Sequence, residues 1–129
     1  MSNNVILDAS ALLALIHQEQ GADIVKPLLK EALMSAVNVS EVLTALQRTD
    51  ILPKEALSSI SDIIQTIIPF DTEQAQLAAE LSPLTKSKGL SLGDRACIAL
   101  GQKMQIPIYT ADIIWGEVQL ENVDIRLIR

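Results

Sequence analysis

The sequence predicts an α/β fold in which a short central parallel sheet is flanked by helices in three layers. Short apolar runs alternate with longer segments of helical periodicity along the whole chain. The 129 residues fit one domain, 1–129. With 49% apolar and 20% charged residues, the chain can bury a core and is not expected to be disordered.

Each expected element follows from a local pattern. Strands are assigned to short apolar runs, and the last of them alternates polar and apolar residues as an edge strand does. Helices are assigned to apolar spacings of three and four residues, with Gly21 as a stop, Pro27 in a first turn and Asp71 or Thr72 as a cap. Pro107 favours an edge or the start of a strand. The strands are expected at residues 5–7, 33–37, 68–70, 106–109 and 123–128. The helices are expected at 9–17, 22–32, 38–49, 54–67, 71–81 and 91–104, with a loop at 82–89.

Composition excludes several functions. A net charge of −6 argues against a broad basic face for nucleic acid, and 2% aromatic residues argue against base-stacking platforms. No apolar run is long enough to cross a bilayer, so no membrane partner is expected. Cys97 is the only cysteine, which excludes an internal disulfide and a thiolate zinc cluster. A cytoplasmic location follows by elimination.

Four acidic residues carry the functional signal: Asp8, Glu41, Asp94 and Asp112. Each lies just past a strand-like run or in the first turn of a helix. In an open parallel sheet such positions converge on one edge, where ligands bind. Four carboxylates there would repel one another unless a divalent cation neutralised them, and hard oxygen ligands suit Mg²⁺ or Mn²⁺. The pattern indicates a metal-dependent phosphoryl-transfer enzyme, most plausibly a nuclease.

Taken singly, each acid also has an interpretation as part of a helix N-terminus, where side-chain oxygens accept hydrogen bonds from free backbone amides. The positions concerned are Asp8, Asn38 with Glu41, Ser91 with Asp94, and Thr110 with Asp112. Both interpretations remain open for each residue.

Four segments resemble the PIN-domain ribonucleases, and among them the VapC-like toxins of prokaryotic toxin–antitoxin modules. The segments are Leu7-Asp8-Ala9-Ser10-Ala11-Leu12-Leu13-Ala14, Ser35-Ala36-Val37-Asn38-Val39-Ser40-Glu41-Val42, Leu90-Ser91-Leu92-Gly93-Asp94-Arg95-Ala96 and Tyr109-Thr110-Ala111-Asp112. They occur in this order and extend over nearly the whole chain.

The resemblance implies a Mg²⁺- or Mn²⁺-dependent endoribonuclease, frequent homodimers, and inhibition by a small antitoxin whose tail crosses the acidic groove. It implies that the four acids are the catalytic and metal-binding residues, with Ser10 and Thr110 as accessory groups. Beside them, Arg95 is expected either to contact phosphate or to form a structural ion pair. Lys86 and Lys88 are the best local basic patch for RNA, or else an ordinary solvated loop.

Three other functions compete with this interpretation. A haloacid-dehalogenase-like phosphatase would use Asp8 as nucleophile, but Ser10 stands where that class has a second Asp. A receiver-like signalling domain would need a lysine after a late strand, and residues 109–112 offer none. A catalytically inactive PIN-like module that binds RNA or protein stays open.

Overall fold

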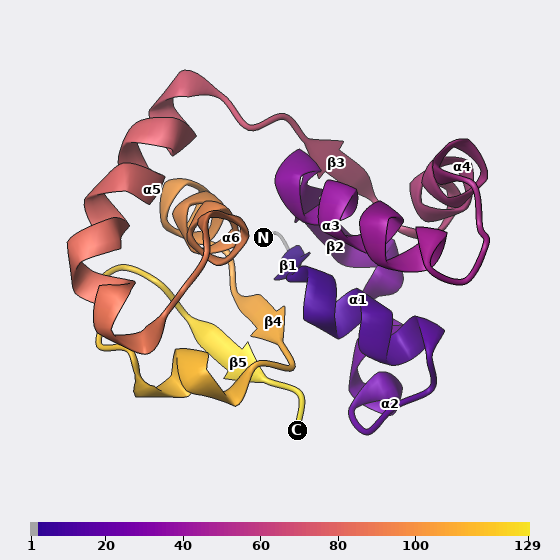
Figure 1. Ribbon diagram of the computed structural model, residues 1–129. Coiled ribbons are helices and arrows are strands. Elements are labelled where there is room, and N and C mark those ends of the chain that lie inside the picture. Colours follow the sequence, from indigo (N-terminus) through magenta and orange to yellow (C-terminus); the bar gives the residue numbers. More distant parts are fainter. Residues whose placement is uncertain (1–2) are drawn as a thin grey trace.

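The computed structural model describes residues 3–129, which form one five-stranded sheet in the order β3-β2-β1-β4-β5. All four strand pairs are parallel. The α/β prediction is therefore confirmed, including the central parallel sheet (Figure 1). The strands are β1 Val5–Leu7, β2 Ala32–Ser35, β3 Thr66–Ile68, β4 Ile108–Thr110 and β5 Ile125–Leu127.

Helices cover both faces of the sheet and enclose two separate cores. Figure 1 shows α5 and α6 on one side of the strands and α1 to α4 on the other. The helices are α1 Ala9–Ile16, α2 Ala22–Val25, α3 Ala36–Gln47, α4 Pro53–Ile63, α5 Thr72–Thr85 and α6 Leu92–Met104. Short 3₁₀ helices are η1 Lys26–Glu31, η2 Lys86–Lys88 and η3 Ile113–Glu117.

The central strand β1 is buried on both faces. Val5 and Leu7 belong to the core under α1 to α4, whereas Ile6 belongs to the core under α5 and α6. Ile6 pairs with Leu33 of β2 and with Ile108 of β4. β1 is the central strand of the sheet. The residue that follows it therefore lies in the middle of the row formed by the C-terminal ends of the strands.

The expected helix at 22–32 is shorter in the structure. Only α2 is α-helical, and the chain continues as the 3₁₀ helix η1, which has Pro27 in its first two positions. Proline lacks the N–H that an α-helix would need there, so the change of helix type at this residue has a direct cause. The prediction of one continuous α-helix was wrong.

Boundaries also shift around β3 and α5. Helix α4 ends at Ile63 and β3 spans Thr66–Ile68, so the expected helix at 54–67 ran too far and the expected strand at 68–70 began too late. Helix α5 continues through Pro83 to Thr85, into the segment expected to be a loop. Thr85 Oγ1 donates to the Leu81 carbonyl at 2.9 Å, which supports the last turn.

The last strand lies at the sheet edge, as its alternating pattern predicts, because β5 pairs only with β4 in the strand order. Pro107 lies immediately before β4, which has neighbours on both sides; its role is that of a strand start.

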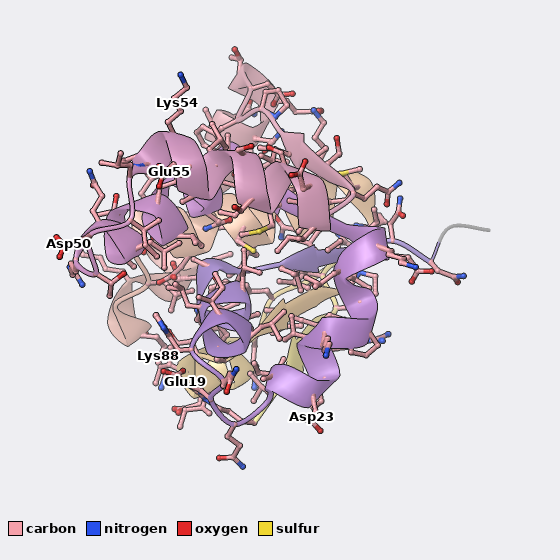
Figure 2. All side chains as sticks on the ribbon, turned by 90° about the vertical axis from the view of Figure 1, so that its right-hand side faces the viewer. Glu19, Asp23, Asp50, Lys54, Glu55 and Lys88 are labelled. Atoms are coloured by element: carbon pink, nitrogen blue, oxygen red, sulfur yellow. The ribbon has the colours of Figure 1, made fainter. Side chains whose placement is uncertain are left out.

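The outer surface of α4 is mixed, because Leu57 and Ile63 are exposed there together with polar residues. Ala56 and Ile60 are buried, whereas Lys54 and Glu55 are exposed. Figure 2 shows Lys54 projecting away from the body of the protein, with Asp50 at the turn between α3 and α4. Across residues 3–129, none of the helices has the length and apolar character that a membrane span requires.

Candidate active site

Asp8 lies at the centre of the acidic edge, directly after β1. Its side chain is only 3% exposed. Two hydroxyls donate to its Oδ2 atom, from Ser10 at 2.6 Å and from Thr110, at the end of β4, at 2.8 Å. Asp8 occupies the N-cap position of α1, yet its carboxylate makes no capping hydrogen bond to the helix. The structure thus turns this carboxylate toward the two residues expected to be accessory groups and away from the helix end.

Burial makes the Asp8 carboxylate difficult to ionise. It raises the pKa of Asp8 from an ordinary 3.8 to about 6, against the lowering effect of the hydrogen bonds from Ser10 and Thr110. The negative charges of Asp94 and Glu41 raise this pKa further. The site therefore holds an acid that a nearby cation would convert to its charged form.

Glu41, in α3, belongs to the same electrostatic cluster. Burial raises its pKa, the hydrogen bond from Asn38 opposes that rise, and the charge of Asp94 adds to it. The buried Cys97 thiol is affected by the same carboxylates. Burial raises its pKa well above the ordinary value, and the negative charges of Asp8, Asp94 and Glu41 raise it further. Three acids, one directly after β1, one in α3 and one in α6, are thus close enough to affect a common neighbour.

Asp94 uses one carboxylate oxygen at the start of α6. Its Oδ2 accepts from the Ser91 backbone N–H at 2.9 Å, while Ser91 Oγ accepts from the Asp94 backbone N–H at 3.2 Å. This is the capping box that the sequence suggested as an alternative to metal binding. Asp94 is half-buried, so it combines a capping bond with a place in the acidic cluster.

Asp112 is bound in a similar way after β4. Its Oδ1 accepts from the Ile114 backbone N–H at 3.1 Å and caps η3. Thr110 Oγ1, which also contacts Asp8, accepts from the Asp112 backbone N–H at 3.1 Å. Thr110 therefore connects Asp8 to the backbone of Asp112, although the two carboxylates do not share a hydrogen bond within the described residues.

The four acids do not form a ready-made coordination sphere. Among residues 3–129, no group of three or more His, Cys, Asp and Glu side chains is arranged to hold a metal ion. The donor chemistry nevertheless suits Mg²⁺ or Mn²⁺, since carboxylate oxygens are the ligands that these ions prefer. The raised pKa values of Asp8 and Glu41 also mark a place where added positive charge would be stabilising.

Asn38 is the residue that the sequence interpretation misjudged. The cap of α3 is Ser35, whose Oγ accepts from the Val37 N–H at 3.2 Å. Asn38 lies inside the helix, is fully buried, and donates to Glu41 Oε1 at 2.9 Å. The signal was present in the sequence, because a polar residue one turn before an acid lies on the same helix face.

The basic residues make contacts outside the acidic cluster. Arg95 Nη1 donates to the Ala78 carbonyl of α5 at 2.9 Å, which joins α6 to α5. Lys88 pairs with Glu117 of η3 at 3.2 Å, and both side chains are substantially exposed. Lys86 is exposed in η2. Arg95 thus makes a structural contact with a backbone carbonyl. That Arg95, Lys86 and Lys88 bind phosphate stays a prediction.

A cavity of about 580 Å³ lies away from the acids. It is formed between α5, the C-terminal end of α6 and the segment after η3, with Leu81, Gln102 and Leu120 in its wall. None of the four acids lines it. The acidic cluster is thus distinct from this cavity, and its chemistry rests on its charges and hydrogen bonds.

Comparisons with known proteins identify similar families and folds. The family model described as PIN domain matches residues 5–119. The DNA-bound VapBC of Salmonella typhimurium superposes with a TM-score of 0.73 at 13% identity, over 100% of each chain. VapBC2 of Rickettsia felis, bound to a promoter DNA fragment, gives 0.72 at 14% identity, over 95% of this chain and 97% of that one.

A third similar structure is VapC20 of Mycobacterium tuberculosis, described as a sarcin–ricin loop cleaving toxin. It gives a TM-score of 0.71 at 16% identity, over 92% of this chain and 98% of that one. At these identities the likeness is one of fold. Among curated proteins, none matches the sequence.

Proposed function

The chain belongs to the PIN domain family, and from that premise we propose that it is a divalent-metal-dependent endoribonuclease, the toxin of a VapBC-type toxin–antitoxin pair. The observation that carries the proposal is the buried Asp8 carboxylate, which accepts hydrogen bonds from Ser10 in the first turn of α1 and from Thr110 at the end of β4, and lies within the electrostatic reach of Glu41 and Asp94. A nuclease of this kind needs carboxylates grouped at the C-terminal ends of the strands, and the burial and hydrogen bonds of Asp8 support the proposal.

The residues would divide the work as follows. Asp8, held by Ser10 and Thr110, would be the fixed ligand. Glu41 would reach the ion from the middle of α3, Asp94 from the first turn of α6 and Asp112 from the N-cap of η3. Mg²⁺ or Mn²⁺, when bound, would supply positive charge that stabilises the attacked phosphate and the leaving oxygen. Ser10 and Thr110 would keep Asp8 in one orientation, which limits the reorganisation that binding requires. Lys86 and Lys88, in the exposed segment before α6, would attract the RNA backbone.

The structural neighbours support one protein partner. Several similar structures are toxin–antitoxin complexes, and we propose a small antitoxin protein as the partner that controls this chain as well.

A homodimer in the cytoplasm is the assembly we propose for the toxin. Sedimentation of the purified chain measures the dimer directly, and growth arrest on expression of the wild type, relieved in Asp8→Asn, tests the toxin role.

The central experiment is an RNA cleavage assay with the purified chain and Mg²⁺ or Mn²⁺. We expect cleavage that stops on chelation and falls by about 100-fold or more in Asp8→Asn. Asp62→Asn is the matched control, because Asp62 is an exposed acid on α4, and it should cleave as the wild type does. Cleavage that survives both chelation and Asp8→Asn would refute the proposal.

The absence of a ready-made group of three metal ligands among residues 3–129 favours one competing function. It is the inactive PIN-like module that binds RNA or protein. The same assay separates the two, since the module would bind RNA without cutting it at any metal concentration. Hydrolysis of a phosphomonoester, with RNA left intact, would point instead to a phosphatase.

A further inference from the structure

A buried amide joins two of the acidic segments. Asn38 is fully buried in α3, and its Nδ2 donates to Glu41 Oε1 at 2.9 Å and to the Gly93 carbonyl of α6 at 3.0 Å. Both partners are acceptors, so only the NH₂ end of the amide can face them. The two donors of one side chain thus connect an acid of α3 to the backbone that immediately precedes Asp94.

Gly93 leaves the space that the Glu41 carboxylate fills. A Cβ atom at position 93 would lie 2.6 Å from Glu41 Cδ and 2.8 Å from Oε1, and it would overlap Oε2. Real Cβ atoms do not approach other heavy atoms so closely, so any side chain here must displace the carboxylate. Gly93 sits in the first turn of α6, where alanine is the better helix former. Helix stability alone therefore does not favour glycine.

The Oδ1 end of the Asn38 amide also indicates that packing alone does not explain this residue. Asn38 Oδ1 is buried and has no hydrogen-bond partner among the described residues. An unsatisfied buried acceptor disfavours the folded state, because the oxygen loses its water on folding and gains nothing in return. A side chain chosen only for packing would avoid this cost. The arrangement is better explained by what the Nδ2 end holds in place.

We propose that Asn38 and Gly93 are positioning residues for the Glu41 carboxylate: Asn38 holds it against the start of α6, and Gly93 provides the room it occupies. Through the Gly93 carbonyl, the same amide fixes Glu41 relative to Asp94. The value of this position for catalysis rests on the proposed function, whereas the positioning itself is a property of the protein alone and is tested separately.

The first test observes the Asn38 side chain directly. In ¹⁵N-labelled wild type we expect the two Nδ2 protons to exchange slowly with water, since both are buried in hydrogen bonds. In Gly93→Ala the displaced carboxylate should shift their resonances and accelerate their exchange by about tenfold or more, as expected for loss of a hydrogen bond to a charged group. Unchanged resonances and exchange in Gly93→Ala would overturn the proposal.

The second test compares Mn²⁺ binding with stability. By calorimetry with Mn²⁺ alone, we expect Gly93→Ala to bind about tenfold more weakly, in the range found when residues that orient metal ligands are changed. Its thermal midpoint should stay the same or rise, because alanine favours the helix. A purely structural role would lower both together. In a Glu41→Ala background the Gly93→Ala effect on Mn²⁺ affinity should disappear, and its persistence there would refute the positioning role.

Asn38→Ala provides a second variant, with Gln74→Ala as the matched control. Gln74 is also a buried helical amide, with one hydrogen bond to the Pro69 carbonyl and a buried, unpaired Oε1. Both variants should lose stability, but only Asn38→Ala should weaken Mn²⁺ binding. Equal Mn²⁺ affinity in the two variants would count against the proposal. A wild type that binds no Mn²⁺ would end the proposed nuclease function, and the amide-exchange test would still decide the positioning.

Discussion

Replacing Asp8 by asparagine should stabilise the metal-free protein at neutral pH, even though the change removes the central acid of the site. Asparagine has nearly the same shape, and its Oδ1 can accept the hydrogen bonds that Ser10 and Thr110 now donate to Asp8 Oδ2. What disappears is the cost of keeping a charge in a side chain that is 3% exposed.

The magnitude follows from the pKa of Asp8. Its folded value of about 6 exceeds the ordinary 3.8, so the folded state binds a proton more tightly than the unfolded state. Stability from this group is therefore present at low pH and is lost as pH rises from about 4 to about 6. The full loss corresponds to about 3 kcal/mol, at about 1.4 kcal/mol per pH unit. The amide hydrogens of asparagine need partners of their own, so we expect a net gain of about 1–3 kcal/mol.

Urea unfolding in EDTA measures this gain at two pH values. Near pH 7.5 Asp8→Asn should be more stable than the wild type, and the advantage should shrink as the pH falls below about 6. Asp62→Asn, on the exposed side of α4, is the control and should show no such dependence. Added Mg²⁺ or Mn²⁺ should stabilise the wild type and not Asp8→Asn, by about 2.7 kcal/mol at a hundred times the dissociation constant. An Asp8→Asn protein less stable than the wild type at pH 7.5 would refute the reasoning.

Three further outcomes are expected. Asp112→Asn should cut RNA about 100-fold more slowly or worse, with little change in thermal midpoint because asparagine also caps η3; a large loss of stability would show that capping dominates there. Ile98→Ala, fully buried in α6, should cost about 2–5 kcal/mol in urea unfolding, and a much smaller loss would mean that the core closes around the gap. Gly21→Ala should cost more than about 1 kcal/mol in the same assay, because φ is +100° and the new Cβ would lie 2.7 Å from Ile128; a neutral result would contradict this geometry.

The sequence predicted the centre of the site better than its margins. The side chains of Asp8, Ser10 and Thr110 are in contact because β1 and β4 are neighbouring parallel strands. Apolar runs that end in polar residues predict this arrangement from the sequence. Asp94 and Asp112 were ambiguous for a physical reason. The first turn of a helix favours the same carboxylate that a metal site would use, so residue type and spacing cannot separate the two roles.

Contacts between distant segments could not be predicted from local sequence patterns. Asn38 was interpreted as a cap because asparagine favours helix starts, but Ser35 caps the helix and Asn38 binds Gly93, 55 positions away in the sequence. The pairing of Lys88 with Glu117 and the bond from Arg95 to the Ala78 carbonyl likewise depend on how α5, α6 and η3 pack. Local helix and strand propensities determine neither contact, because each contact requires the assembled tertiary structure.

The four acids are attached to parts of the fold that differ in how readily they open. Asp8 follows β1, the central strand of the sheet, and its backbone N–H donates to the Tyr109 carbonyl at 3.0 Å. Asp94 and Asp112 sit where α6 and η3 begin, and helix ends open far more readily than a central strand does, whereas Glu41 lies in the middle of α3. Hydrogen exchange should therefore rank the Asp8 amide among the slowest in the molecule. Any contraction of the acidic cluster around a cation would be made by the starts of α6 and η3 moving toward Asp8, which stays in place.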